Sequence, residues 1–484
     1  MMTMAKPKKG DIVELTLDKM ANGGSAVGRL DGFVIFVRGG VPGDVVKARI
    51  YKKRRTHAEA RLESVIHPSA HRISPPCAYA GYCGGCQWQQ VAYDRQLAYK
   101  QALVKDPLIH IGGLKDVIVH PVFPSGEIFG YRNKMEFSFS DRRWYLPHEM
   151  DKREKEGNFA LGLHVPGAFQ KVIDLETCLL QKETGNDILR AVKAHVKTSG
   201  IPVYGLKSHE GFWRYLTIRS SGAFDQWMVN VVTSTARPEV IRSLADLMHH
   251  KIPSVTTVVN NINRRKASIA VGDHEQIISG DGYILDRIGP FTFRVSANSF
   301  FQTHPAAAQR LYEQVVAYAR PTARDTVVDL YSGTGTIPLF FAPRVQSVVG
   351  MELSPSAVSD AVRNCAENHI DNCEFICGDI RETLGALSHR PDILIIDPPR
   401  VGMHKDVLAR VLDLSPERIV YVSCNPATLA RDLGQMVQAY HLHEIQPVDM
   451  FPNTYHVESV ARLSRRNPPS TVPKPADPLL TDGF

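Results

Sequence analysis

The hydrophobic and polar positions of this chain follow two different rhythms. Up to about residue 290, apolar and polar residues alternate in short runs such as GFVIFVRG and YLTIRS, which are separated by glycine, proline and polar turns. Alternation with period two is typical of β-strands with one buried face. From about residue 292, a helical pattern precedes short apolar runs such as TVVDLYSG and DILIIDPP, with helical segments between them. This second rhythm predicts βαβ units around a parallel sheet.

These patterns divide the chain into parts and predict an α/β fold class. Several short strands within residues 10–66 predict a small OB-like β-barrel at the N-terminal end. The middle strands predict a mixed central domain, and a Rossmann-like parallel sheet follows it. The proline-rich end of the chain is typical of disorder. The expected divisions are 1–66 (barrel), 67–116 (cysteine-rich connector and helix), 117–290 (central domain), 291–466 (parallel-sheet domain) and 467–484 (disordered tail).

Composition narrows the class of protein. Of the 484 residues, 43 % are hydrophobic and 22 % are charged, which excludes a disordered chain and a collagen. No uninterrupted run of about 18 apolar residues could cross a bilayer. The N-terminal sequence also lacks the apolar core of a secretory signal. We therefore expect a cytoplasmic protein with no membrane partner and no obligate protein partner.

The net charge of +7 is concentrated in the predicted barrel. Residues 1–61 contain 13 Lys and Arg against 6 Asp and Glu, so the remainder of the chain is neutral overall. A basic excess confined to one module indicates a polyanion-binding surface, and on an OB-like barrel it favours contacts with nucleic-acid phosphates. The densest run of cations comprises Lys47, Arg49, Lys52, Lys53, Arg54 and Arg55.

Small residues and acids follow the predicted parallel strands in a pattern that indicates a cofactor site. Residues 326–336 read TVVDLYSGTGT, a buried strand that ends in a glycine-containing turn. The turn is not GxGxxG, so a dinucleotide pyrophosphate is not its natural ligand. Glu352 ends the next strand, where a carboxylate can bind a ribose diol. Asp379 and Asp397 end two further strands. Together these features resemble the class I S-adenosylmethionine methyltransferases.

Cys424 and Glu458 are the candidate catalytic pair. Cys424 lies between an apolar strand (RIVYV) and a helix, where we expect the helix N-terminus to stabilise its thiolate. Carbon C5 of a pyrimidine is a poor nucleophile until a thiolate adds to C6. A base must then remove the C5 proton so that the thiol can leave. Glu458, in the last strand-like segment, suits this second role.

Several separated motifs resemble the RNA 5-methyluridine methyltransferases. The resemblance implies Cys424 as nucleophile and Glu458 as proton acceptor. It also implies cofactor contacts from Gln302, Tyr331, Thr336, Glu352, Asp379 and Asp397. The family often has Asn where this chain has Thr336. The motifs are YSGTGT (331–336), DPPR (397–400), SCNP (423–426), HVESV (456–460), SANSFFQTHPAAAQRLY (296–312) and FGYRNKMEFS (129–138).

Four cysteines predict a metal site. Cys77, Cys83 and Cys86 form C-x5-C-x2-C, and Cys178 follows in LETCLL. Four thiolates can bind zinc or a [4Fe–4S] cluster, and the spacing does not decide between them. Resemblance to the branch of the family that has both an N-terminal TRAM barrel and a cluster implies a structural [4Fe–4S] cluster. The remaining thiols, Cys365, Cys373 and Cys377, are expected in the core.

The combination of barrel and cysteines also bears on the substrate. It resembles the bacterial 23S ribosomal RNA uridine-C5 methyltransferases, so the resemblance implies ribosomal RNA as the partner and S-adenosylmethionine as the methyl donor. We expect Arg132 and Lys134 of the central domain to help the barrel hold an RNA loop. The alternatives are a methyltransferase acting on tRNA uridine or on cytosine, a non-enzymatic RNA-binding protein, and a zinc-dependent nucleic-acid module.

Overall fold

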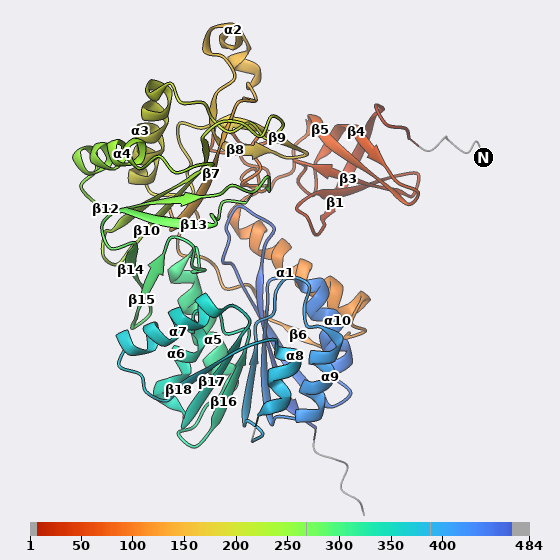
Figure 1. The fold of residues 1–484 in the computed structure, drawn as a ribbon. Coiled ribbons are helices and arrows are strands. Elements are labelled where there is room, and N and C mark those ends of the chain that lie inside the picture. The colour runs from red at the N-terminus through yellow and green to blue at the C-terminus, as the bar shows by residue number, and fades with distance from the viewer. Residues whose placement is uncertain (1–6, 268, 388, 467–484) are drawn as a thin grey trace, which may run out of the picture.

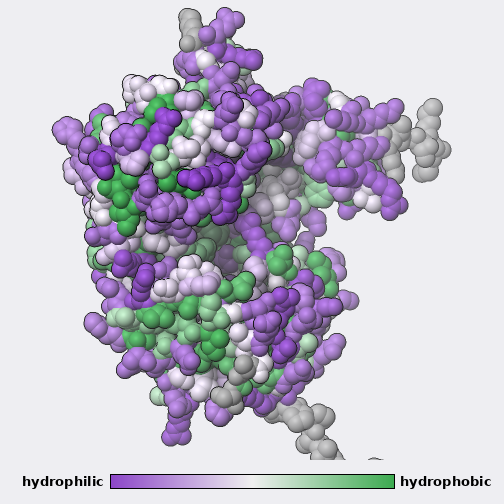
Figure 2. Space-filling view, viewed as in Figure 1, coloured by the Kyte–Doolittle hydropathy of each residue, from purple (hydrophilic) through white to green (hydrophobic). Residues whose placement is uncertain are grey.

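Five strands close into a barrel at the N-terminal end of the computed structural model, which describes residues 7–267, 269–387 and 389–466 (Figure 1). The barrel order is β1-β2-β3-β5-β4, and inward side chains such as Leu17, Ile35 and Ile50 fill its interior. Hydrophilic side chains cover most of the barrel on the face shown in Figure 2. The predicted small barrel is thus confirmed. Its strands are β1 (Ile12–Met20), β2 (Ala26–Leu30), β3 (Phe33–Arg38), β4 (Val45–Lys53) and β5 (His57–His67).

The connector contains the helix expected from its sequence, and this helix packs against the C-terminal domain. Helix α1 (Tyr93–His110) lies along α10 of the C-terminal domain, and its Val104 and Leu108 belong to that domain's core. Strand β6 (Ile118–Val119) pairs in parallel with β21 of the same domain. The expected start of the central domain at residue 117 is therefore wrong, because backbone pairing assigns β6 to the C-terminal sheet.

A seven-stranded sheet forms the central domain, in the order β13-β12-β11-β10-β7-β8-β9. Helices α3 (Glu183–Ser199) and α4 (Pro238–Lys251) cover one face, where Ile188 and Leu244 join a core with the strands. A short 3-10 turn (Pro147–Lys152) and α2 (Arg153–Glu156) project from it (Figure 1). The strands are β7 (Lys134–Ser140), β8 (Ala160–Val165), β9 (Ala168–Asp174), β10 (Trp213–Ser220), β11 (Trp227–Thr233), β12 (Val255–Ile262) and β13 (His274–Ser279).

A hairpin connects the central and C-terminal domains. Its strands β14 (Tyr283–Ile288) and β15 (Phe291–Ser296) pair only with each other as strands. Their side chains Ile284 and Phe293 pack into the same core as α5. The expected boundary at residues 290 and 291 divides this hairpin, so it is wrong: β14 and β15 pair with each other and pack into one core with α5, although the alternation of β14 resembles that of the preceding central strands.

The C-terminal domain is a doubly wound sheet of order β18-β17-β16-β19-β20-β22-β21-β6, with helices on both faces (Figure 1). Successive residues point to opposite faces, so Val327 packs with α5 and Val328 packs with α9 and α10. Strands β16 to β20 are parallel, and β22 is antiparallel to both of its neighbours. The elements are α5 (Pro305–Ala319), β16 (Thr326–Leu330), α6 (Thr336–Phe341), β17 (Ser347–Glu352), α7 (Pro355–Glu367), β18 (Cys373–Cys377), α8 (Ile380–Thr383), β19 (Ile393–Ile396), α9 (Lys405–Leu414), β20 (Arg418–Ser423), α10 (Pro426–Met436), β21 (Tyr440–Val448) and β22 (Glu458–Arg465).

This order confirms the predicted Rossmann-like domain and locates its ligand crevice. The chain winds in one direction from β16 to β18 and returns to β19 on the other side of β16. Such a reversal opens a crevice at the carboxyl ends of the two strands, where α/β proteins bind ligands. Among the described residues, no helix is both long and apolar enough to cross a membrane. The predicted tail, 467–484, lies outside the described residues.

Candidate active site

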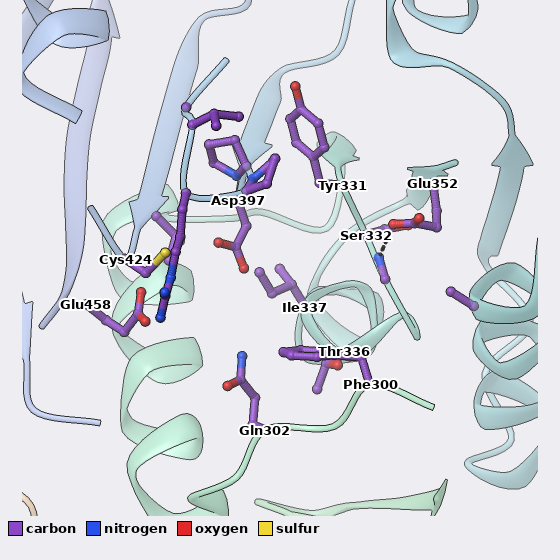
Figure 3. Close-up of a pocket in the computed structure, with 18 of the residues that line it drawn as sticks. Phe300, Gln302, Tyr331, Ser332, Thr336, Ile337, Glu352, Asp397, Cys424 and Glu458 are labelled. Atoms are coloured by element: carbon purple, nitrogen blue, oxygen red, sulfur yellow. Dashed lines mark hydrogen bonds between the residues drawn. The ribbon is translucent and has the colours of Figure 1, made fainter. Parts of the chain in front are cut away.

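One large cavity, of about 1530 Å³, opens at the carboxyl edge of the C-terminal sheet. The central domain contributes Arg132 to its wall, and the cysteine loop contributes Gly84 and Gly85. Cys424 and Glu458 lie together on one side of the close-up in Figure 3, and Glu352 lies on the opposite side. The structure therefore brings together every predicted catalytic and cofactor residue, namely Gln302, Tyr331, Thr336, Glu352, Asp379, Asp397, Cys424 and Glu458.

The turn after β16 has the geometry of a ligand-binding loop. Tyr331, Gly333 and Gly335 all have positive φ, at 66°, 53° and 78°. A Cβ at Gly335 would stand 3.0 Å from both the Ala361 side chain and the Phe375 ring. Glycine is required there because a side chain would suffer both an unfavourable backbone conformation and a close contact. The turn therefore passes tightly between strand and helix and leaves its backbone facing the cavity.

Glu352 is held beside this turn by backbone donors. Its two carboxylate oxygens accept hydrogen bonds from the Gly333 N–H, at 3.1 Å, and the Ser354 N–H, at 2.8 Å. Each carboxylate oxygen has further acceptor capacity, and the side chain lines the cavity. The position predicted for a ribose-binding acid is therefore fixed by the turn itself.

The two aspartates at neighbouring strand ends have different environments. Asp379 caps α8 through the Arg381 N–H, at 2.9 Å, and the Arg381 guanidinium lowers the pKa of this carboxyl to about 2. Asp379 is thus a capping residue as well as part of the cavity wall. Asp397 follows β19 and is buried, which raises its pKa to about 6. Asp397 lies between Cys424 and Tyr331 in Figure 3.

Sheet register brings Cys424 and Glu458 together. Ser423, the last residue of β20, pairs directly with Ser459 of β22. Because the strands are antiparallel, the residue after Ser423 and the residue before Ser459 emerge at the same edge. Burial raises the pKa of Glu458 to about 8, and the Asp397 charge adds to this shift. A glutamate with such a pKa is suited to proton transfer near neutral pH.

The Cys424 thiol is protonated in this arrangement. Burial, followed by the charges of Glu458 and Asp397, raises its pKa to about 11, whereas the Arg400 charge opposes this shift. The expected stabilisation of the thiolate is therefore wrong, because this environment raises the pKa of the thiol. Asn425 caps α10 through the Ala427 N–H, at 3.1 Å, but burial and the two acids outweigh any effect of the helix end on the thiol.

Sequence reasoning missed three side chains in the cavity. Arg400 belongs to the DPPR motif, and its charge lowers the pKa of both Cys424 and Glu458. His456 belongs to HVESV, and burial followed by the Arg400 charge lowers its pKa to about 4, so the ring is neutral at pH 7. Their place in quoted motifs could have indicated both. Phe300, in the motif SANSFFQTHPAAAQRLY, lines the cavity while remaining 69 % exposed, and its place in that motif could have indicated it as well.

The structure does not support the predicted metal site. Cys77, Cys83 and Cys86 lie in the connector loop, and Cys178 follows β9; all four are half-buried. Across the described ranges, no group of three or more His, Cys, Asp or Glu side chains is arranged to hold a metal ion. Burial raises the pKa of Cys83 to about 11 and that of Cys86 to about 12, and charges on neighbouring cysteines of the set add to both shifts.

The other thiols only partly follow their prediction. Cys365 is buried in the core, as expected. Cys373 is half-buried and hydrogen-bonded to Cys365. Cys377 is exposed, so its assignment to the core is wrong. Cys377 is the last residue of β18, the strand at the edge of the sheet.

Comparison with known proteins agrees with this geometry. The family model described as tRNA (Uracil-5-)-methyltransferase matches residues 239–466, and the TRAM domain model matches residues 6–62. An uncharacterised RNA methyltransferase of Chlorobaculum tepidum is 43 % identical over 95 % of this chain and 97 % of its own length. Another, from Halalkalibacterium halodurans, is 36 % identical over 96 % of this chain and 99 % of its own.

A solved structure shares the whole architecture. The Pyrococcus abyssi tRNA (uracil-54, C5)-methyltransferase, in complex with S-adenosyl-L-homocysteine, has a TM-score of 0.74 and 28 % identity. The match covers 93 % of this chain and 99 % of that one. The class I methyltransferase fold, the S-adenosylmethionine donor and the TRAM barrel expected from the sequence are thereby confirmed. The chain belongs to the RNA uracil-5-methyltransferase family, S-adenosylmethionine-dependent enzymes that here carry an N-terminal TRAM domain.

Proposed function

We propose that this enzyme methylates C5 of a uridine in 23S ribosomal RNA, with Cys424 as the nucleophile and Glu458 as the proton acceptor. The observation that carries the proposal is the pairing of Ser423 with Ser459, which places the two side chains at one edge of the cavity. Asp397 and Arg400 line the same cavity, and their charges shift the pKa of both Cys424 and Glu458.

The reaction follows from the chemistry of a pyrimidine. The Cys424 thiol loses its proton to a neighbouring base, and its sulfur bonds to C6 of the uracil, which moves electron density onto C5. S-adenosylmethionine supplies an electrophilic methyl group when bound. After C5 has taken that methyl group, Glu458 accepts the C5 proton, the C5–C6 double bond re-forms, and the sulfur leaves C6. Because Asp397 has a pKa of about 6, it is ionised at pH 7 and is the nearby carboxylate suited to receive the thiol proton.

The position of the cavity is consistent with a base that leaves the RNA helix. Chemistry on a base requires it to be extruded from its stack. Exposed Phe300 at the cavity offers an aromatic face, and RNA-binding proteins use such faces for unstacked bases. The basic barrel, with Arg132 and Lys134 of the central domain, can then hold the flanking phosphates.

Ribosomal RNA is proposed on the combination of barrel and cysteine loop, which resembles the 23S enzymes. Transfer RNA is the second candidate, since the Pyrococcus abyssi neighbour is described as a tRNA (uracil-54, C5)-methyltransferase. Nucleoside mass spectrometry of both RNAs from a strain that lacks the protein separates them. Loss of 5-methyluridine from 23S RNA alone supports the proposal, and loss from tRNA alone overturns its substrate.

We also propose that Cys77, Cys83, Cys86 and Cys178 hold a structural [4Fe–4S] cluster. The charges of these thiols act on one another's pKa, so the four are neighbours, and the Gly85 N–H donates to the Cys83 sulfur at 3.3 Å. Four thiolates can bind one zinc ion or a [4Fe–4S] cluster, and the resemblance to relatives that have both a TRAM barrel and a cluster favours the cluster.

Analysis of the protein after anaerobic purification tests this second proposal. Four irons and four sulfides per chain, with a brown absorbance that is lost in Cys178→Ser, support the cluster. One zinc per chain, or no metal at all, contradicts it. Cys377→Ser is the matched control, because this exposed thiol should leave the iron content unchanged.

A further inference from the structure

The segment 449–457 joins β21 to β22 and delivers the catalytic base. It ends where β22 begins, at Glu458, and its Phe451, Thr454 and His456 line the cavity. The segment is not part of a helix or a strand, so neighbouring parts must fix its backbone. The contacts that do so come mostly from segments that precede the C-terminal domain in the chain.

One face of α1 supports the start of the segment. Lys100 donates to the Asp449 carboxylate at 2.5 Å and to the Phe451 carbonyl oxygen at 3.0 Å. Tyr93, two turns earlier on the same helix face, donates its hydroxyl to the other Asp449 oxygen, also at 3.0 Å. The Phe451 N–H in turn donates to Asp449 at 3.0 Å. Residues almost 350 positions apart in the chain thus form one hydrogen-bonded group.

The Lys100–Asp449 ion pair is completely buried. Both side chains have 0 % exposure. A pair of this kind is costly to desolvate and adds little net stability compared with apolar residues, but it tolerates only a narrow geometry. In this chain, the geometry of the pair positions the entry into segment 449–457.

Asn453 fixes the middle of the segment. It has a positive φ of 65° and exchanges two hydrogen bonds with the Gln96 amide of α1, at 2.8 and 3.2 Å. Its carbonyl oxygen accepts from the N–H groups of both Gln87 and Trp88 at 3.0 Å. Its own amide donates to the Ile128 carbonyl oxygen at 2.8 Å. Helix, cysteine loop and the approach to the central domain therefore meet at one residue.

The barrel reaches the same segment. Tyr455 packs against the barrel core, and a Cβ at Gly24 would come within 2.9 Å of its ring. Trp88, whose N–H binds Asn453, also donates its indole N–H to the Gly24 carbonyl oxygen at 3.0 Å. The RNA-binding barrel is thus connected to the segment through Tyr455 and Trp88.

We propose that Lys100, Gln96 and Tyr93 of α1 are positioning residues that set the approach of Glu458 to the C5 proton. This inference rests on the proposed function. The N-terminal half of the chain then has two roles: it binds RNA, and it controls the geometry of proton removal. The cofactor turn after β16 receives none of these contacts, so cofactor binding should not depend on them.

The test is the double variant Lys100→Met with Asp449→Leu, which removes the ion pair without leaving a buried unpaired charge. We expect kcat to fall at least tenfold with little change in the KM for RNA. We also expect a covalent protein–RNA adduct to accumulate on denaturing gels, because addition of Cys424 continues while proton removal slows. Release of tritium from [5-³H]uridine RNA should fall in parallel. The affinity for S-adenosyl-L-homocysteine should remain that of the wild type.

Two further variants keep the test decisive. Gln96→Ala removes the hydrogen bonds to Asn453 without changing a charge. It should accumulate the same adduct in a smaller amount, and it remains available as a test if the double variant does not fold. Arg418→Met with Asp325→Leu removes another internal ion pair, of 2.6 Å, at the amino-terminal end of β20, and should accumulate no adduct.

An unchanged kcat in the α1 variants would overturn the inference. A fall in kcat without accumulation of the adduct would also overturn it, because it would reveal a merely structural role. An equal adduct in the control pair would do the same. Failure of the proposed function looks different, since Glu458→Gln would then trap no adduct and Cys424→Ala would stay active.

Discussion

Glu458 opposes ionisation of Cys424, and the two share one edge of the sheet because β20 and β22 pair in register. With a pKa of about 8 for Glu458 and about 11 for Cys424, both groups hold their protons at pH 7. The chemistry needs the opposite state of both, since the sulfur must attack and the carboxylate must accept a proton. Both groups must therefore lose their protons before the reaction can be completed.

Methyl transfer should therefore increase with pH. As the pH rises from 6.5 to 9, the ionised fraction of Glu458 grows through its pKa of about 8, and kcat/KM should rise close to tenfold per unit on the acidic side. Initial rates with saturating methyl donor measure this. A profile that is flat over this range would contradict a raised pKa at the proton acceptor.

Substitution of the pair should separate addition from elimination. Cys424→Ala should lower turnover by at least about 10³-fold, a loss expected for removal of a nucleophile, while RNA and cofactor binding persist. Glu458→Gln should form the C6 adduct and then stop, because no group removes the C5 proton. Gels run after denaturation detect the adduct. Full activity in Cys424→Ala would refute the nucleophile.

The stability of the protein should also report on Glu458. A carboxyl whose pKa rises from 4.5 to about 8 on folding favours the folded state fully below pH 4.5, and this advantage is lost as the pH rises through 8. Glu458→Gln cannot ionise, so its melting temperature relative to that of the wild type should rise between pH 5 and 8 and level off above pH 8. An identical pH dependence of the two melting temperatures would contradict the raised pKa of Glu458.

The strand ends explain why so much of the site could be predicted. In a parallel sheet, residues that follow each strand meet at one edge, so Glu352 and Asp397 could be placed together from the apolar runs before them. The charge state of Cys424 could not, because it depends on burial and on carboxyls that are distant in sequence. The hairpin β14–β15 was divided wrongly since alternation shows strands but not the core into which they pack. The segment 449–457 depends on partners about 350 residues away, which no local pattern indicates.

Cations beside the cavity should each add one phosphate contact, and the salt dependence of RNA binding measures the number of these contacts. Arg132 lines the cavity, and Lys134, two residues on, has its pKa lowered by burial and by the charges of Arg219 and Arg132. Cations crowded in this way gain from a phosphate between them. Lys134→Gln should reduce the slope of log K against log salt by about one, as expected for one lost phosphate contact. Lys251→Gln, at the end of α4 on the central domain, should leave the slope unchanged.

The cofactor turn gives a last test through Gly335. Alanine there must adopt a φ of 78° and would bring its Cβ within 3.0 Å of Ala361 and Phe375. The left-handed conformation costs about 1–2 kcal/mol, and the close contact about 1–3 kcal/mol more. The turn can relieve this only by moving away from Glu352, so S-adenosyl-L-homocysteine should bind at least about tenfold more weakly, since about 1.4 kcal/mol corresponds to tenfold. Gly167→Ala is the matched control: its φ is 79° but nothing lies within 4 Å of the added carbon, so it should lose some stability and no cofactor affinity. Calorimetric titration of both variants measures the difference, and equal affinities would show that the tight passage of the turn does not serve the cofactor.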